Sequence, residues 1–368
     1  MHLFYFHIYL LVVLLPNFIE CALYKNLKVA CKTEQGLNVD WYYLYKLPKH
    51  YTSDNRSKTE LKGYDYMFAT SDEHENWQFS EHTINMPTSM PAKTMVDLFD
   101  DASVLLIAYN DEYPNGTVKS GGGHAKGVLA TDGVTGFWLI HSVPKFPSIP
   151  YYLYPATGSI YGQSFVCITF SASEVEKIAK QLLVNAPNIY FQRVPSRLTG
   201  KFPLLESVID KKWNRTEPYY SVLDINSLEN VHFKSFAKSA KYNQELYEDL
   251  MAPELGSNLL VESWRNGGGN IASNCSLGQK VYNIQEIKGD PRSLAFRSSQ
   301  DHSKWAVSQS TGFKLFHWRV GGTSPNWICV GDINRQQGQL NRGGGQLCQK
   351  NKIISRLYSS LINDFESC

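Results

Sequence analysis

Two stretches of the sequence carry the same pattern: Gly-Gly-Gly-His-Ala-Lys-Gly-Val-Leu-Ala at residues 121–130 and Asp-His-Ser-Lys-Trp-Ala-Val-Ser at residues 301–308. In an extended strand, residues i and i+2 point to one face, so each stretch offers an imidazole beside an ammonium group. If His124 and Lys126 meet His302 and Lys304, one imidazole can attack phosphorus while the other protonates the leaving oxygen. The two lysines then offset charge on the phosphoryl oxygens. The pattern predicts a phosphodiester-cleaving site that needs no metal and no cofactor.

A single His-x-Lys is a weak signal, because a chain of this length contains one by chance. The two pairs become informative because other sequence blocks accompany them in a fixed order. Together with the two stretches, these blocks closely resemble the deoxyribonuclease II family over nearly the whole mature chain. The blocks are residues 39–48, 121–147, 154–158, 161–167, 301–308, 327–335 and 342–348.

The deoxyribonuclease II family resembles the phospholipase D superfamily in turn, in which two half-sites each supply a His-x-Lys motif. The resemblance implies an α/β fold of two phospholipase D-like halves, with mixed β-sheets flanked by helices and a pseudo-twofold axis through one active site. We expect a signal peptide at residues 1–21, an N-terminal half at residues 22–195 and a C-terminal half at residues 196–368. Alternating strand-like and helix-like stretches agree with an α/β protein.

The same resemblance implies the activity. We expect an acid endodeoxyribonuclease that hydrolyses double-stranded DNA to 3′-phosphate ends through a phosphohistidine, without a metal. We favour His124 as the nucleophile because its motif is more complete, and the two histidines could exchange roles. Alternatives are a lipid phosphodiesterase, or a secreted nucleic-acid-binding or host-interaction protein with weak or no catalysis. DNA is the expected partner, and no obligate protein partner is evident.

Four further residues are candidates for binding the substrate. Asp132 lies one residue beyond the usual place of the superfamily aspartate, whereas the second half has Ser308 in that region. Asp332 and Asn334, in the Gly-Asp-Ile-Asn-Arg segment at residues 331–335, resemble the polar residues that follow the second histidine. An ordinary polar turn is the alternative there. His141 has the matching place in the first half, where a hydrogen-bonded core histidine is equally compatible with the sequence.

The charge of the chain is close to balanced. The formal net charge of the 368 residues is +2, which lacks the basic bias of a protein that binds nucleic acid by charge alone. Ten histidines change this in acid, because protonation below about pH 6 makes the chain cationic. An acid nuclease fits this composition better than a general nucleic-acid-binding protein.

The N-terminus resembles a secretory signal peptide. An apolar run from residue 3 to residue 15 is short for a membrane span and ends at Pro16, with cleavage expected near Cys21 or Ala22. No later segment is long and apolar enough to cross a bilayer. We therefore expect a protein of the secretory pathway, lysosomal or extracellular, with no membrane anchor.

Six cysteines remain after Cys21, and an even number in a secreted chain indicates three disulfides with fifteen possible pairings. The family resemblance implies the pairs Cys31–Cys167, Cys275–Cys368 and Cys329–Cys348. Four sequons for N-glycosylation, at Asn55, Asn115, Asn214 and Asn274, agree with the secretory route.

Hydrophobic patterns predict several elements. Residues 104–109, 127–130 and 136–140 indicate buried strands, the last two joined by a turn at Asp132 and Gly133. A capping box from Ser173 to Glu176 is expected to open a helix that ends before Pro187. A second helix is expected near the C-terminus, with a buried stripe from Ile353 to Ile362.

Overall fold

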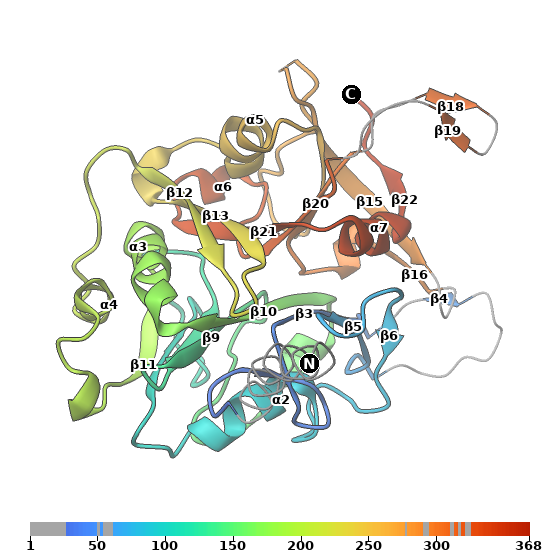
Figure 1. The fold of residues 1–368 in the computed structure, drawn as a ribbon. Helices are drawn as coiled ribbons and strands as arrows, with labels where there is room; N and C mark the ends of the chain where they lie inside the picture. The colour runs from blue at the N-terminus through green and yellow to red at the C-terminus, as the bar shows by residue number, and fades with distance from the viewer. Residues whose placement is uncertain are drawn as a thin grey trace, which may run out of the picture.

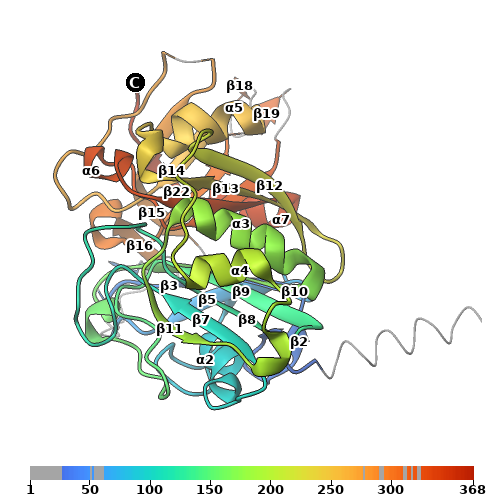
Figure 2. The same ribbon diagram turned by 90° about the vertical axis from the view of Figure 1, so that its left-hand side faces the viewer.

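Two large β-sheets face each other across a shared core in the computed structural model (Figures 1 and 2). The structure describes residues 27–49, 52–53, 62–276, 278–289, 294–309, 313–315, 318–320 and 325–368. The expected signal peptide and the sequon at Asn55 lie outside these residues, and both remain predictions.

The first sheet is built from the N-terminal half. Its eight strands lie in the order β11-β7-β8-β9-β10-β3-β5-β6, and every neighbouring pair is antiparallel. The strands are β3 (Trp41–Lys46), β5 (Tyr66–Thr70), β6 (Gln78–Phe79), β7 (Leu105–Tyr109), β8 (Gly127–Thr131), β9 (Thr135–His141), β10 (Gln163–Ser171) and β11 (Ile189–Arg193). A small ribbon of β1 (Cys31–Lys32) and β2 (Asn38–Val39) precedes it.

The second sheet is built mainly from the C-terminal half and is mixed, because β14 and β15 run parallel. Its strands lie in the order β12-β13-β21-β20-β17-β14-β15-β16-β4, with β22 also paired to β15. They are β4 (Thr52–Ser53), β12 (Tyr220–Asn226), β13 (His232–Lys238), β14 (Leu259–Glu262), β15 (Val281–Gly289), β16 (Leu294–Arg297), β17 (Trp305–Ser308), β20 (Trp327–Gly331), β21 (Gly344–Lys350) and β22 (Ile362–Phe365). A separate hairpin is formed by β18 (Phe313–Leu315) and β19 (Trp318–Val320).

Helices lie both between the sheets and on their outer faces (Figure 1). Helices α3 and α7 contribute to the core between the sheets, α2 packs on the outer face of the first sheet, and α5 on that of the second. The helices are α2 (Met90–Met95), α3 (Val175–Asn185), α4 (Pro203–Ile209), α5 (Ala252–Leu255), α6 (Gln337–Leu340) and α7 (Lys352–Ser360). The α/β fold class expected from the sequence is thereby confirmed.

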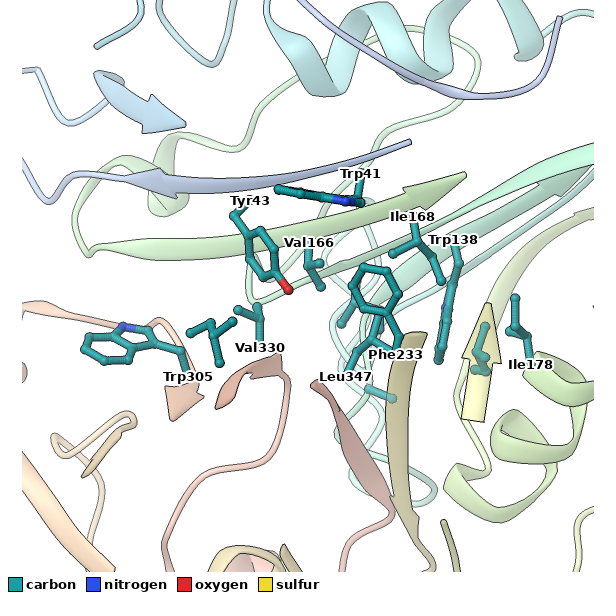
Figure 3. Close-up of a cluster of buried hydrophobic side chains, with 14 of the residues drawn as sticks. Trp41, Tyr43, Trp138, Val166, Ile168, Ile178, Phe233, Trp305, Val330 and Leu347 are labelled. Atoms are coloured by element: carbon teal, nitrogen blue, oxygen red, sulfur yellow. The ribbon is translucent and has the colours of Figure 1, made fainter. Parts of the chain in front are cut away.

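Successive side chains along a strand point to opposite faces of its sheet, and this alternation produces the layering. In β3, Trp41 and Tyr43 point into the core between the sheets, and Tyr42 points to the outer layer. Figure 3 shows Trp41, Tyr43 and Val166 of the first sheet facing Trp305 and Val330 of the second. The two halves therefore bury one apolar cluster jointly, and the division at residues 195 and 196 stays a prediction.

The expected strands and both expected helices are present, but the capping box is wrong. A turn of 3₁₀ helix at Ala172–Glu174 precedes α3, and the side chains of the N-cap residues Ser171 and Glu174 accept no cap hydrogen bond. Glu176 instead accepts from the backbone N–H of Leu204 at the start of α4, at 3.0 Å. A contact between helices thus replaces the local one that the sequence pattern indicates.

Three disulfides have the pairing that the resemblance implies. Cys31–Cys167 joins β1 to β10, and Cys275–Cys368 ties the C-terminal residue to the loop before β15. Cys329–Cys348 links β20 and β21, in which the two cysteines are direct partners in the strand register. Within the described part of the chain, no helix has the length and apolar character that a membrane crossing requires.

Candidate active site

The first pair lies just before β8, and the second half of the chain fixes its histidine. The backbone N–H of His124 donates to the carbonyl of Gly343 at 2.7 Å. Its ring Nδ1 lies 2.6 Å from the carbonyl oxygen of Asp332. A carbonyl only accepts hydrogen bonds, so Nδ1 carries the proton and Nε2 is left with a lone pair in the neutral ring.

The second pair lies just before β17, and the first half of the chain fixes its histidine. The backbone N–H of His302 donates to the carbonyl of Gly162 at 2.8 Å. Its Nδ1 lies 2.9 Å from the carbonyl oxygen of Ser142 and 3.2 Å from Oε1 of Gln163. The same tautomer follows, with Nε2 again free to act on a substrate.

The same strand register occurs in both half-sites, and this register produces the reciprocal anchors. The residue after each motif lysine, Gly127 or Trp305, pairs with Ile140 of β9 or Val330 of β20. The lysine carbonyls accept from His141 at 3.2 Å and from Gly331 at 3.0 Å. Ser142 and Asp332 are therefore equivalent residues, and a pseudo-twofold axis relates the two half-sites.

A carboxylate and an arginine flank the first pair. Asp111 bonds the ammonium group of Lys126, and its Oδ2 lies 3.8 Å from Nε2 of His124 and 3.3 Å from Nη2 of Arg342. Nζ of Lys126 lies 3.4 Å from the same Nε2. Burial alone would raise the pKa of the Asp111 carboxyl, but Lys126, His124 and Arg342 hold that pKa well below its usual range.

The two pairs act on each other electrostatically. Burial, followed by Lys126, lowers the pKa of His124 to about 3, with Asp111 opposing. Burial, Lys304, Lys126 and His124 lower the pKa of His302 well below its ordinary value. Burial and Lys126 likewise lower the pKa of Lys304. Because groups of both halves contribute, the four side chains form one coupled site, and a bound anion would reduce the repulsion among its positive groups.

Two of the remaining candidates lie in the loop after β20. Asp332 contributes its backbone carbonyl to His124, and its side chain accepts from the N–H of Gly345 at 2.9 Å. Burial raises the pKa of Asp332 to about 7. Asn334 is also buried, and its Oδ1 has no hydrogen-bond partner among the described residues. A buried amide oxygen of this kind is compatible with a donor that a ligand brings.

The side chains of the other two candidates make their own contacts away from the motif histidines. Asp132 lies in the β8–β9 turn, where its carboxylate accepts from the N–H groups of Val134 and Thr135 at 2.8 and 2.9 Å. His141 is fully buried, with its ring against Phe146 and Phe165. Asp132 therefore stabilises a turn and His141 packs in the core, although the backbone of His141 still contacts Lys126.

Asp111 and Arg342 are site residues that the sequence motifs did not indicate. Asp111 follows the buried strand β7, whose Tyr109 pairs with Gly127 beside the first motif. The sequence signal that could have indicated Asp111 is a carboxylate two residues beyond a strand that lies next to the motif. Arg342 directly precedes the glycines of residues 343–345.

Two further features are the arrangement of side chains that could bind a metal and the exposure of the glycosylation sequons. Among the residues that the structure describes, no group of three or more His, Cys, Asp or Glu side chains is arranged to hold a metal ion. The sequons at Asn115 and Asn214 are exposed, and Asn274 is half-buried. Their modification remains a prediction.

A family model and several named proteins match nearly the whole chain. A family model described as Deoxyribonuclease II matches residues 30–368. Rat deoxyribonuclease-2-beta is 37% identical over 349 residues, covering 92% of this chain and 93% of its own. Plancitoxin-1 of Acanthaster planci is 34% identical, with 92% of each chain covered. Bovine deoxyribonuclease-2-alpha is 34% identical, with 92% of this chain and 90% of its own covered.

Proposed function

The chain belongs to the deoxyribonuclease II family, and on this premise we propose that it is an endodeoxyribonuclease that cleaves double-stranded DNA in acid without a metal. The observation that carries the proposal is the reciprocal anchoring of His124 and His302 beside two buried lysines. Each Nε2 is unprotonated in the neutral ring, and the cationic surroundings favour a phosphate.

The reaction needs two protonation states of imidazole. One Nε2 attacks phosphorus and the P–O5′ bond breaks, while the other ring, as imidazolium, gives its proton to the 5′-oxygen. The second ring then takes a proton from water, and that water breaks the P–N bond and releases a 3′-phosphate end. Lys126 and Lys304 offset charge on the phosphoryl oxygens.

The neighbours of each ring separate the two roles. Asp111 lies beside Nε2 of His124, and a carboxylate stabilises imidazolium. Burial and Lys126 favour the neutral form of both rings, but no carboxylate is among the groups that act most strongly on His302. We therefore assign attack to His302 and proton donation to His124, the reverse of the roles that the more complete first motif favours.

An acidic optimum follows from the donor. Burial and Lys126 lower the pKa of His124 to about 3, so the imidazolium form becomes more abundant as the pH falls. Bound phosphate adds negative charge and makes protonation easier. Disulfides are typical of oxidising compartments, which supports a lysosomal or extracellular location.

Nicking of supercoiled plasmid at about pH 5 in millimolar EDTA tests the proposal. We expect nicked circles whose ends resist terminal transferase until a phosphatase removes the 3′-phosphate. His124→Asn and His302→Asn should each abolish nicking, and the double variant should be no worse, because residues that act as one unit are not additive.

The matched control is His232→Asn, since His232 is exposed on β13. This variant should nick DNA at the wild-type rate. Loss of all activity in EDTA with recovery in magnesium would contradict the metal-free mechanism. Cleavage of a phospholipid head group in place of plasmid would favour the lipid phosphodiesterase.

A further inference from the structure

The two half-sites have equivalent backbone anchors, but they differ in one pair of side chains beside the histidine. Tyr109 of β7 pairs with Gly127, and Glu262 of β14 pairs with Trp305, so the strands before the two motifs are equivalent. Two residues beyond these strand ends, the first half has Asp111 and the second has Trp264.

The partners of these two residues are equivalent as well. His124 is anchored by Gly343 and His302 by Gly162, and the residues before these glycines are Arg342 and Tyr161. Arg342 contacts Asp111 at 3.3 Å. The rings of Tyr161 and Trp264 meet edge to face, with their centroids 4.5 Å apart. An ion pair beside His124 thus corresponds to an aromatic pair beside His302.

The aromatic pair lies directly against the second histidine. The indole of Trp264 meets the His302 ring at a centroid distance of 4.9 Å and an interplanar angle of 71°. Both Trp264 and Tyr161 are half-buried, so part of the surface of each residue is exposed to solvent. The backbone holds the tryptophan in place, because its carbonyl accepts from Nε2 of Gln336 at 3.1 Å.

We propose that Trp264, supported by Tyr161, is a nucleobase-binding subsite, which contacts the base next to the scissile phosphate and makes the two sides of the otherwise symmetric site unequal. The inference rests on the proposed function. A phosphate held by the histidine–lysine pairs would bring the bases on either side of it close to His302 and to the indole of Trp264. Every nucleobase has a π-face, so stacking on an indole accepts all four bases.

Oligonucleotides with a single cleavable phosphodiester test the subsite. The remaining linkages are uncharged methylphosphonates, and the nucleotide on one or the other side of the cleavable bond has either a base or none. For wild type, we expect a lower KM when the contacted base is present. Trp264→Ala should raise that KM roughly 5- to 150-fold, the range for loss of one base–aromatic stack, and should remove the difference between the two substrates. Trp264→Phe should restore most of the discrimination.

A second aromatic pair supplies the matched control. Tyr220 and Tyr242 also meet edge to face, at 5.4 Å, and Tyr220 begins β12 at the outer edge of the second sheet. Tyr220→Ala should change neither KM nor the discrimination.

The outcomes separate the subsite from a merely structural role. An equal loss of kcat on base-bearing and abasic substrates in Trp264→Ala would mean that the indole only orients His302, and would overturn the subsite. Unchanged kinetics would overturn it too. If wild type cleaves none of these oligonucleotides and no plasmid, the proposed nuclease function fails instead.

Discussion

His124 and His302 have equivalent pairs of backbone anchors, so in the proposed mechanism the groups beside each ring distinguish their roles. Asp111 and Arg342 flank one ring, and Trp264 and Tyr161 flank the other. Asp111 opposes the lowering of the His124 pKa and so favours the proton donor there, whereas burial and nearby lysines favour the neutral form of His302. In the proposed mechanism, this difference between equivalent positions assigns the two roles.

A substrate that needs no proton donor should identify the nucleophile. In thymidine 3′-(p-nitrophenyl phosphate) the leaving group departs as an anion, so His124→Asn should still form the covalent intermediate. Its hydrolysis should be slow, because the base that activates water is missing. We expect a burst of about one nitrophenolate per enzyme, as is typical of an accumulating covalent intermediate, and a thymidine phosphate adduct on His302 by mass spectrometry. A burst in His302→Asn with the adduct on His124 would reverse the roles.

Local spacing predicted the histidine–lysine pairs, whereas their neighbours required the tertiary fold. Residues two apart on a strand share a face whatever the rest of the chain does, so Lys126 beside His124 was readable from the sequence. Asp111 reaches Lys126 only because β7 pairs with β8. Asp132 has nearly the spacing of the superfamily aspartate, yet the β8–β9 hairpin uses its carboxylate to cap a turn.

At the scale of elements, β20 and β21 carry the groups that anchor His124. Asp332 follows β20, and Gly343 precedes β21, while Cys329–Cys348 links the two strands. This disulfide therefore braces the first half-site from the second half of the chain. Alternating apolar residues predicted strands such as β7 correctly, but the capping box failed because α4 offers Glu176 a partner that no local pattern encodes.

Removing the Cys329–Cys348 link should lower activity as well as stability. Cys329→Ala with Cys348→Ala should cost about 3 kcal/mol of unfolding free energy for a loop of this length in the chain-entropy model. We also expect a lower kcat at a temperature at which the variant is fully folded, because the His124 anchors loosen. Thermal unfolding and plasmid nicking measure the two effects.

The control is the disulfide that ties the C-terminus. Cys275→Ala with Cys368→Ala opens a longer loop and should cost about 4–5 kcal/mol in the same framework, yet it should leave kcat unchanged in the folded protein. Equal kcat values in both double variants would mean that β20 and β21 hold the anchors without the disulfide.

At the scale of the whole molecule, Asp40 connects the two halves. It is fully buried between β2 and β3, and its carboxylate accepts from Oγ of Ser227 at 2.5 Å and from the N–H of Glu229 at 2.9 Å, in the turn between β12 and β13. Burial raises the pKa of Asp40 to about 6, with those hydrogen bonds opposing. The folded protein therefore binds a proton here more readily than the unfolded chain.

This connection should make the molecule more stable in acid. A raised folded-state pKa gives a contribution that is fully present below the unfolded value of about 4 and is lost as the pH rises through about 6. Between pH 7 and pH 4, wild type should gain up to about 3 kcal/mol of unfolding free energy relative to Asp40→Asn. Urea unfolding at several pH values measures the difference, and parallel profiles would show that Asp40 does not titrate in this way.

Each motif histidine is anchored by backbone carbonyls from the other half of the chain, and this affects when during synthesis the site can form. The chain emerges from the ribosome N-terminus first, and His124 leaves it long before its anchor at Asp332, which lies 208 residues further on. A nascent chain that has folded only its first sheet has one imidazole without its orienting carbonyls, and the other imidazole is not yet made. Under the proposed mechanism, hydrolytic activity therefore arises only late in synthesis, and a fragment truncated before residue 332, which lacks the His124 anchor, should not cleave DNA.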